Sequence, residues 1–318
     1  MNPALPQPLK DAVEGLLEGV SRKELAARAQ AISSAYRAGG GSAAAVADVL
    51  DTLAYVVARL PATYAVALAV LSAVREAVPD FAPKSLLDVG AGPATASWAA
   101  RETWPALERL TLTDSNASFL ALARKLSPVA DAEFLARDLR RDDLPSAELV
   151  VAGYVLAEIP AAAQHAVIEK LFAAASDVLV LIEPGTPEGF TRIRDARAEL
   201  IAKGAHVLGP CTHAHTCPVA APDWCHFSQR LPRSRDHMHA KSASVPYEDE
   251  RYAWLAVSRT RRSIFEGKAR VLAPPKESKP GLAFKLCTPA GLENRTVARR
   301  DKETYARARR IDWGDVIA

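Results

Sequence analysis

The stretch SLLDVGAGPATASWAA, residues 85–100, decides the fold class of this chain. A short apolar run, residues 85–89, reaches Gly90-Ala91-Gly92, and a helix-forming segment follows. Glycines at this place let the backbone approach a ligand, and doubly wound sheets bind ligands in the crevice at the carboxyl ends of their strands. The pattern therefore predicts an α/β domain with a ligand crevice at this loop.

Strand and helix patterns alternate on both sides of this loop, over residues 84–185. Such alternation predicts a parallel, doubly wound sheet. The expected strands cover residues 85–90, 109–115, 132–139, 147–159 and 177–185, and the expected helices cover 97–104, 117–126, 161–175 and 189–204. Residues 9–80 are expected to form an N-terminal helical layer, with one helix over 43–59 and the next starting at Pro61.

Two acidic residues lie at the ends of the second and third expected strands. Asp114 is placed to accept both hydroxyls of a ribose, and Asp138 is placed to meet an adenine amino group. A dinucleotide site would prefer a third glycine at position 95, where this chain has Thr95. The residues therefore favour another adenosine cofactor, and a sheet that no longer binds a cofactor stays as the alternative.

The segment LLDVGAGPATASW together with Asp114 and Asp138 resembles class I S-adenosylmethionine (SAM)-dependent methyltransferases. The resemblance implies that Asp88, Gly90 and Gly92 flank the methionine part and the sugar of SAM. The catalytic residue is unknown: the loop after the fourth strand offers only Tyr154 and Glu158 as weak candidates, and no cysteine nucleophile precedes residue 211. The sequence thus predicts a cofactor pocket and leaves methyl transfer open.

The four cysteines, Cys211, Cys217, Cys225 and Cys287, have the spacing C-x5-C-x7-C-x61-C. Zinc fingers usually present two cysteines on one tight turn, which neither short gap allows. Wider, irregular gaps suit a [4Fe–4S] cluster, and a cysteine followed by proline, as at Cys217, occurs beside such clusters. A zinc site that uses His213, His215 or His226 and unligated thiols remain as alternatives. A radical-SAM enzyme is rejected, because four cysteines would close every corner of the cluster.

A more specific resemblance comes from six segments that occur in this order along the chain: RLPATYAVAL, SLLDVGAGPATASWAA, EPGTPEGF, CTHAHTCPV, DWCHFSQRLPR and CTPAGLENRTVARRD. They resemble the family of methyltransferase-like proteins associated with the mitochondrial ribosomal small subunit and its bacterial relatives. The resemblance implies a role in small-subunit assembly, binding to its rRNA, doubtful methyltransferase activity, and a [4Fe–4S] cluster on the four cysteines. An active rRNA methyltransferase and a zinc-binding RNA-binding protein are the alternative functions.

Charge is unevenly distributed along the chain. Residues 251–318 contain 16 Lys and Arg against 7 Asp and Glu, a net charge of +9, whereas the remaining residues carry 24 basic and 30 acidic side chains, a net charge of −6. A basic C-terminal part on an acidic body favours a polyanion partner such as rRNA. The expected phosphate-binding residues are Arg230, Arg233, Arg235, Arg259, Arg261, Arg262, Lys268, Arg270, Arg295, Arg299, Arg300, Arg307, Arg309 and Arg310. The aromatic residues Trp254, Phe265, Tyr305 and Trp313 are expected either to stack on bases or to belong to the core.

The expected domain organisation has four parts: a helical region (1–80), a SAM-binding domain (81–205), a Cys/His-rich cluster-binding insertion (206–250), and closing strands with a basic RNA-binding part (251–318). Within the insertion, residues 206–247 are expected to be a loop. No signal peptide or membrane span is expected, since the longest apolar run, residues 65–74, is too short to cross a bilayer. We therefore expect a bacterial cytoplasmic protein without disulfides, which is a monomer when it is not on the ribosome.

Overall fold

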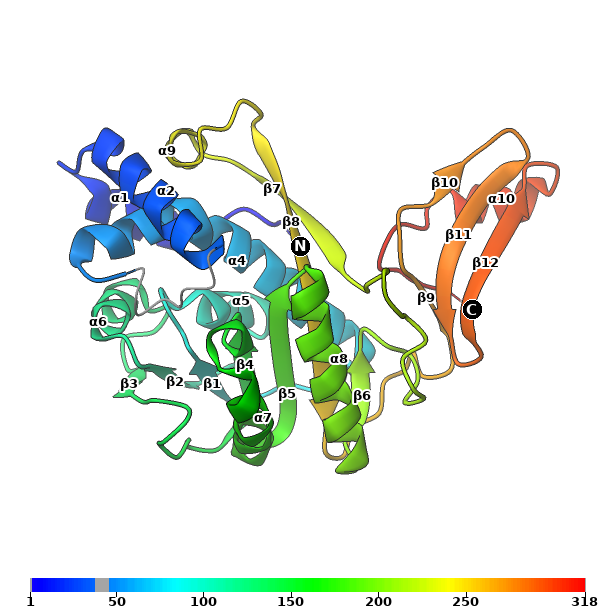
Figure 1. Ribbon diagram of the computed structural model, residues 1–318, viewed down its shortest axis with the longest axis horizontal. Coiled ribbons are helices and arrows are strands. Elements are labelled where there is room, and N and C mark those ends of the chain that lie inside the picture. The colour runs from blue at the N-terminus through cyan, green and yellow to red at the C-terminus, as the bar shows by residue number, and fades with distance from the viewer. Residues whose placement is uncertain (1, 38–45, 318) are drawn as a thin grey trace.

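A mixed eight-stranded sheet organises the computed structural model, which describes residues 2–37 and 46–317 (Figure 1). The strand order is β3-β2-β1-β4-β5-β8-β6, with β7 paired to β8. The first five strands are parallel, whereas β6, β7 and β5 all run antiparallel to β8. The strand bounds are β1 Ser85–Val89, β2 Arg109–Asp114, β3 Glu133–Ala136, β4 Ala147–Gly153, β5 Ala175–Pro184, β6 His206–Gly209, β7 Phe227–Pro232 and β8 Tyr247–Ser258.

Helices cover both faces of this sheet, as the doubly wound prediction requires. Neighbouring strand residues point to opposite faces, so Leu86 enters one core and Leu87 the other. The first face packs on α4 (Val49–Ala77) and α5 (Thr95–Thr103). The second face packs on α7 (Ala161–Ala174) and α8 (Pro187–Ala202), while α6 (Ala117–Leu126) packs on β2 and β3. The predicted parallel α/β core is confirmed.

The N-terminal layer differs from the expected pair of helices around Pro61. It consists of α1 (Gln7–Leu17), α2 (Arg22–Arg37) and the single helix α4, which runs through Pro61. The prediction of separate helices over 43–59 and after Pro61 was wrong, and its first residues, 43–45, lie outside the described part. Burial along almost all of α4 stabilises the helix despite the backbone hydrogen bond that proline removes.

Helix α4 is also long and apolar enough to cross a membrane by length and composition alone. In the structure, 72% of its most apolar window is buried inside the protein, where it packs between the main sheet and α2. The expectation that no segment is long enough to span a membrane was therefore wrong. Thr and Pro residues interrupt the apolar run in the sequence, but they do not end the helix.

Residues 206–247 were expected to be a loop throughout, and this prediction was wrong. The segment contains β6, β7 and α9 (Arg235–Ala240), and β7 pairs with β8 along its whole length. The cysteine-bearing residues 210–226 in between are irregular, as expected. Strand β7 forms because it pairs with β8, which lies later in the chain. The local sequence of β7 does not reveal this pairing.

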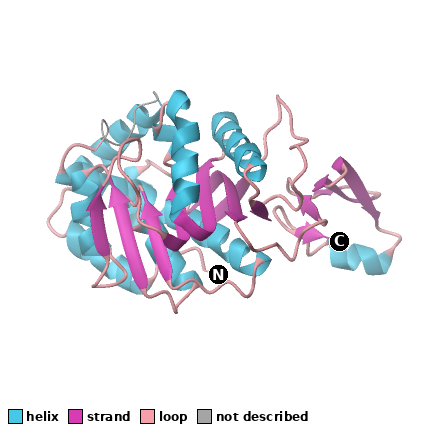
Figure 2. Cartoon of the chain, turned by 90° about the horizontal axis from the view of Figure 1, so that it is seen from below, coloured by secondary structure: helices cyan, strands magenta, loops and turns pink. Residues whose placement is uncertain are grey.

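A second, five-stranded sheet forms the C-terminal end of the molecule, beyond β6 (Figures 1 and 2). Its order is β10-β11-β9-β13, with β12 paired to β11. The bounds are β9 Ala269–Val271, β10 Lys276–Glu277, β11 Gly281–Thr288, β12 Gly291–Ala298, α10 Lys302–Ala308 and β13 Val316–Ile317. Its small core, which includes Val271, Phe284 and Leu286, is separate from the two cores of the main sheet.

Candidate functional site

The glycine loop after β1 lies at the carboxyl edge of the sheet, where the sequence placed a cofactor. Gly90 and Gly92 have positive φ angles of +64° and +50°. A Cβ at Gly90 would come within 2.5 Å of Val155, so this glycine allows the loop to pack against the segment after β4. A Cβ at Gly92 would meet nothing within 4 Å, so only Gly92 has open space beside it.

Asp114 ties the ends of β1 and β2 together. Its Oδ2 accepts a hydrogen bond from the Gly92 backbone N–H at 2.9 Å, and its Oδ1 accepts one from the Asn116 N–H at 2.8 Å. Burial raises the pKa of this carboxyl above its usual value. Each oxygen keeps a second lone pair, so the group can hold the loop and still accept from hydroxyls of a sugar.

Asp88 lies beneath the loop and holds the start of α5. Its Oδ2 accepts from the Ser97 backbone N–H at 2.9 Å and from the Ser97 hydroxyl at 2.7 Å. The side chain is buried, and burial raises its pKa to about 7. Asp88 therefore supports the position of the glycine loop from inside the fold.

Asp138 follows β3 at the same edge, but its carboxylate has a partner. Arg140 makes a two-point contact with it, Nε to Oδ1 at 3.0 Å and Nη2 to Oδ2 at 2.8 Å. These bonds hold the pKa of Asp138 at about 2. An adenine amino group at this position would have to share the carboxylate with a guanidinium.

The segment after β4 carries the two weak catalytic candidates. Tyr154 adopts a positive φ of 63°, which strains a non-glycine residue, and its hydroxyl is buried without a hydrogen-bond partner among the described residues. Burial and the Glu250 charge raise the pKa of Tyr154 well above its usual value. Glu158 lies exposed at the end of η1 (Leu156–Glu158). The Tyr154 hydroxyl therefore has no described base that could take its proton in general acid–base chemistry.

Two ion pairs at this edge were missed by the sequence reasoning. Arg59 on α4 pairs with Glu250 on β8, Nη2 to Oε1 at 3.0 Å. Glu183, buried at the end of β5, pairs with Arg192 on α8 at 2.6 Å, and burial raises the pKa of Glu183 to about 7. No local pattern marks these residues as pairs: Arg59 and Glu250 lie 191 positions apart, whereas Glu183 and Arg192 lie in two consecutive elements, β5 and α8. Together they fasten helices over the carboxyl edge of the strands.

The four cysteines converge on one cavity, although one is far downstream. Cys211, Cys217 and Cys225 lie in the irregular segment between β6 and β7, whereas Cys287 lies on β11 of the second sheet. All four are free thiols that line the same apolar cavity. Burial and the other three thiols raise the pKa of Cys225 well above its usual value, and burial raises that of Cys287 to about 12. The irregular segment after β6 and the second sheet thus both contribute cysteine thiols to the lining of this cavity.

Two buried arginines fix the backbone around these thiols. Arg197 on α8 donates from Nη2 to the His213 and His215 carbonyl oxygens at 2.6 and 2.9 Å. Arg270 on β9 donates to the Pro210 carbonyl at 2.7 Å and to the Gly314 carbonyl at 2.6 Å. Both side chains line the cavity, so positive charge faces the thiols. Such charges favour thiolate ligands over neutral thiols.

In the part of the chain that the structure describes, no three of the cysteine sulfur atoms lie within 4.8 Å of one another. Four thiolates around zinc, at about 2.3 Å each, would lie about 4 Å from one another. Among the described residues, only His165, Glu169 and Glu199 bring three potential ligand atoms mutually within 4.8 Å. The loop histidines have other contacts: His213 Nε2 lies 3.4 Å from Cys287 Sγ, and His226 Nδ1 lies 3.2 Å from the Trp224 carbonyl.

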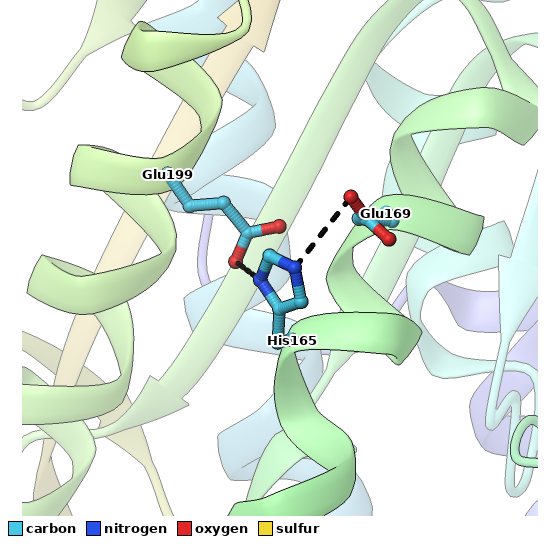
Figure 3. A group of neighbouring side chains, drawn as sticks. All are labelled: His165, Glu169 and Glu199. Atoms are coloured by element: carbon cyan, nitrogen blue, oxygen red, sulfur yellow. Dashed lines mark ion pairs between the residues drawn. The ribbon is translucent and has the colours of Figure 1, made fainter.

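The group His165, Glu169 and Glu199 lies between α7 and α8 (Figure 3). His165 Nδ1 lies 2.9 Å from Glu199, its Nε2 lies 3.6 Å from Glu169, and Lys203 also pairs with Glu169. The His165 side chain is 66% exposed. We interpret the group as an ion-pair network that links two helices.

Some basic residues of the C-terminal part hold the fold, others pair with surface carboxylates, and a few are exposed without a described partner. Arg259 donates to the Phe172 and Ala175 carbonyls, Arg261 pairs with Asp177 and Asp80, and Arg270 is buried. These arginines hold the fold. Arg300, Arg309 and Arg310 are exposed and have no side-chain partner within the described ranges. Trp254 is buried core, so it does not stack on a ligand.

The strand order, the glycine loop and the acid at the end of β2 define the class of protein: a class I SAM-methyltransferase fold with a second sheet appended. The chain belongs to the family described as mitochondrial small ribosomal subunit Rsm22, whose model matches residues 49–318. The predicted fold class and family are both confirmed.

Named relatives agree with the family. The chain is 27% identical over 289 residues to the human ribosome assembly protein METTL17, mitochondrial, covering 84% of this chain and 62% of the relative. It is 22% identical to the Rsm22-cox11 tandem protein 2, mitochondrial, of Schizosaccharomyces pombe, covering 84% of this chain and 43% of the relative. The chain therefore spans less than two thirds of these relatives.

Solved structures of similar fold include the magnesium protoporphyrin IX methyltransferase of Synechocystis PCC 6803 with bound SAH. It has a TM-score of 0.41 and 14% identity, covering 64% of this chain and 87% of that one. A putative RNA methyltransferase of Pyrococcus horikoshii has the same TM-score and identity, covering 63% and 84%.

The expectation of a bacterial cytoplasmic protein is contradicted by these comparisons. The matching family is described as mitochondrial, and both the human and the fission-yeast relatives carry mitochondrial names. The expectation depended on the character of the first residues, which does not identify the compartment.

Proposed function

We propose that this protein is a methyltransferase-fold assembly factor of the small ribosomal subunit that binds the subunit's rRNA and holds a [4Fe–4S] cluster on Cys211, Cys217, Cys225 and Cys287. The family and the name of the human relative support the ribosomal role. The observation that carries the proposal is the convergence of these four thiols on one cavity, three from the irregular segment between β6 and β7 and one from β11 of the second sheet.

The residues around the cavity suit a cluster better than a zinc ion. A cubane binds each thiolate through a different iron atom, so its ligands lie farther apart than those of a single ion. When bound, the cluster supplies a covalent cross-link between its four cysteine ligands. Arg197 and Arg270 offer positive charge beside it. The high pKa of Cys225 and Cys287 without metal means that binding must release their protons.

Anaerobic purification with metal analysis tests the cluster. We expect a brown protein with an absorbance band at about 400 nm and about four iron atoms per chain. Cys287→Ser should lose most of the iron, whereas His213→Asn should keep it, because His213 lies beside Cys287 and is not a proposed ligand. One zinc per chain, no colour, and metal loss in the His213 variant would instead favour the Cys/His zinc alternative.

The second part of the proposal concerns the edge of the main sheet. We propose that Gly90, Gly92 and Asp114 hold SAM, that Asp88 supports the loop, and that Asp138 lies near the adenine. Open space at Gly92 and the second lone pairs of Asp114 support this assignment. Methyl transfer is not part of the proposed function, because the Tyr154 hydroxyl is buried without a hydrogen-bond partner among the described residues and Glu158 lies exposed at the end of η1.

An active rRNA methyltransferase is the competing function, and the glycine loop and Asp114 favour it. Titration calorimetry with SAM tests binding, with Asp114→Asn as the weakened variant. Mapping of small-subunit rRNA methylation after deletion of the gene tests catalysis. An unchanged methylation map with impaired subunit assembly is the expected result, and the loss of one methyl group would contradict it.

The part boundaries 1–80, 81–205, 206–250 and 251–318 are proposed as functional divisions, although β8 of the last part completes the main sheet. We also propose that the protein is a monomer away from the ribosome. Sedimentation of the purified protein tests this, and a stable dimer at micromolar concentration would contradict it.

A further inference from the structure

A second cavity lies directly beside the cysteine cavity, and the proposed functions above do not use it. The two cavities share Val219, Cys225 and Leu272. The residues that give the second cavity its chemical character are Asp223, Trp224, His226, Arg251, Lys285 and Trp313. They come from the irregular cysteine segment, from β8, from β11 and from the C-terminal segment.

Flat aromatic rings form part of its lining. Trp224 and His226 are stacked, with centroids 5.2 Å apart and planes inclined by 20°, and Trp313 meets His226 edge-on at 5.0 Å. Trp224 is held by a hydrogen bond from its Nε1 to the Gly185 carbonyl at 3.0 Å. Rings held in this way lose little freedom when a planar ligand stacks on them.

Charged groups lie beside the rings. Lys285 pairs with Asp223, so these two side chains are fixed on one side of the cavity. Arg251 is exposed, and its guanidinium has no hydrogen-bond or ion-pair partner within the described ranges 2–37 and 46–317. The buried Trp313 Nε1 likewise has no acceptor among those residues. A donor and a cation are thus left unpaired around an aromatic surface.

This combination selects a class of ligand. A planar heterocycle stacks on indole and imidazole, a phosphate pairs with an unpartnered arginine, and a carboxylate such as Asp223 accepts from an exocyclic amino group. Bases in a duplex already stack on each other and cannot enter a cavity between rings. We propose that this cavity binds one unpaired nucleotide of the RNA, with its base on the Trp224–His226 stack and its phosphate at Arg251.

This inference rests on the proposed rRNA binding and assigns that binding a specific contact. The test measures the affinity of the wild-type protein, purified with its native metal content, for a fluorescein-labelled single-stranded RNA and for a duplex of the same sequence. Trp224→Leu removes the stacking surface, whereas Trp224→Phe keeps an aromatic ring, and both lose the bond to Gly185. Arg251→Gln removes the phosphate partner, and Arg300→Gln is its control, an exposed arginine outside the cavity.

We expect Trp224→Leu to weaken binding of the single strand by about 5- to 150-fold, and Trp224→Phe by much less. Arg251→Gln should weaken binding by more than Arg300→Gln, which changes the same net charge. A 2-aminopurine placed in the single strand should lose fluorescence on binding to wild type and keep it with Trp224→Leu. Melting temperature and metal content of each variant show whether the fold is retained, and Arg251→Gln, an exposed residue, tests the cavity even if a Trp224 variant misfolds.

Equal affinity of wild type, Trp224→Leu and Arg251→Gln for the single strand would overturn the inference while leaving rRNA binding intact. The same holds if wild type binds small-subunit rRNA but prefers the duplex. If wild type binds neither oligonucleotide nor small-subunit rRNA, the proposed function fails together with this inference.

Discussion

Burial dominates the behaviour of the acidic side chains in the main sheet. Asp88 and Glu183 end strands β1 and β5, and both are nearly inaccessible to solvent. Hydrogen bonds from Ser97 favour the ionised form of Asp88, and Arg192 favours that of Glu183, yet burial raises each pKa to about 7. Asp88, which the sequence presents as a ligand-binding residue, and Glu183, which it does not, thus both hold the fold at the edge of the candidate site.

This burial predicts a pH dependence of stability that Asp88→Asn should reduce. A carboxyl whose pKa rises from 3.8 in the unfolded chain to about 7 in the folded one gives its full stabilisation below about pH 4. That stabilisation is lost as the pH rises through about 7. Denaturant unfolding at pH 5 and pH 8 should show a smaller difference for Asp88→Asn than for wild type.

Glu183 provides the internal control for this measurement. It titrates in the same direction and is unchanged in the variant, so the pH dependence should shrink without vanishing. Parallel stability curves for wild type and Asp88→Asn would show that Asp88 is already ionised in the folded protein at pH 5.

At the level of elements, β9 links the cysteine segment to the C-terminal end of the chain. Arg270 on this short strand donates to the carbonyls of Pro210 and Gly314, which lie 104 positions apart in the sequence numbering. The backbone of Arg270 itself pairs with that of Cys287 on β11. One buried side chain therefore sets the distance between a proposed ligand segment and the strand that carries the fourth cysteine.

We predict that Arg270→Lys lowers the free energy of unfolding by about 1–3 kcal/mol. A lysine has one ammonium group and cannot reproduce two divergent bonds, so a buried carbonyl loses its donor. Hydrogen exchange near residues 210–217 and 313–316 should increase. Arg299→Lys, at an exposed pair with Glu277, should cost less than about 1 kcal/mol. Similar losses in both variants would refute the bridging role.

On the scale of the whole molecule, the C-terminal net charge of +9 overstates the positive charge that a polyanion can contact. Arg259, Arg261 and Arg270 hold carbonyls and carboxylates of the main sheet and the cysteine segment. The charge that remains accessible to a polyanion is carried by residues such as Arg309 and Arg310, which are exposed beside α10.

We predict that Arg309→Gln with Arg310→Gln weakens rRNA binding and flattens its salt dependence. Loss of two phosphate contacts should reduce the slope of log affinity against log salt by about 1.4 for a single strand. The control is Lys10→Gln with Lys23→Gln, which removes the same charge from the exposed faces of the N-terminal helices. Equal changes in slope for the two double variants would mean that only net charge matters.

The sequence by itself determined the alternation of strands and helices from β1 to β5 and the loop of Gly90 and Gly92. These features depend on local hydrophobic periodicity and on glycines with special backbone freedom. Both signals lie within short stretches of the sequence, so they can be recognised without the fold. The four cysteines were also visible, and their gaps argued against a zinc knuckle.

Only the tertiary structure decided the features that join distant segments. Packing on both sides keeps α4 continuous through Pro61, and pairing with β8 makes β7 a strand. The same holds for Cys287 beside the earlier cysteines and for Trp313 beside His226. Each of these contacts forms between residues far apart in the chain, so its energy depends on the complete fold, and no local pattern encodes it.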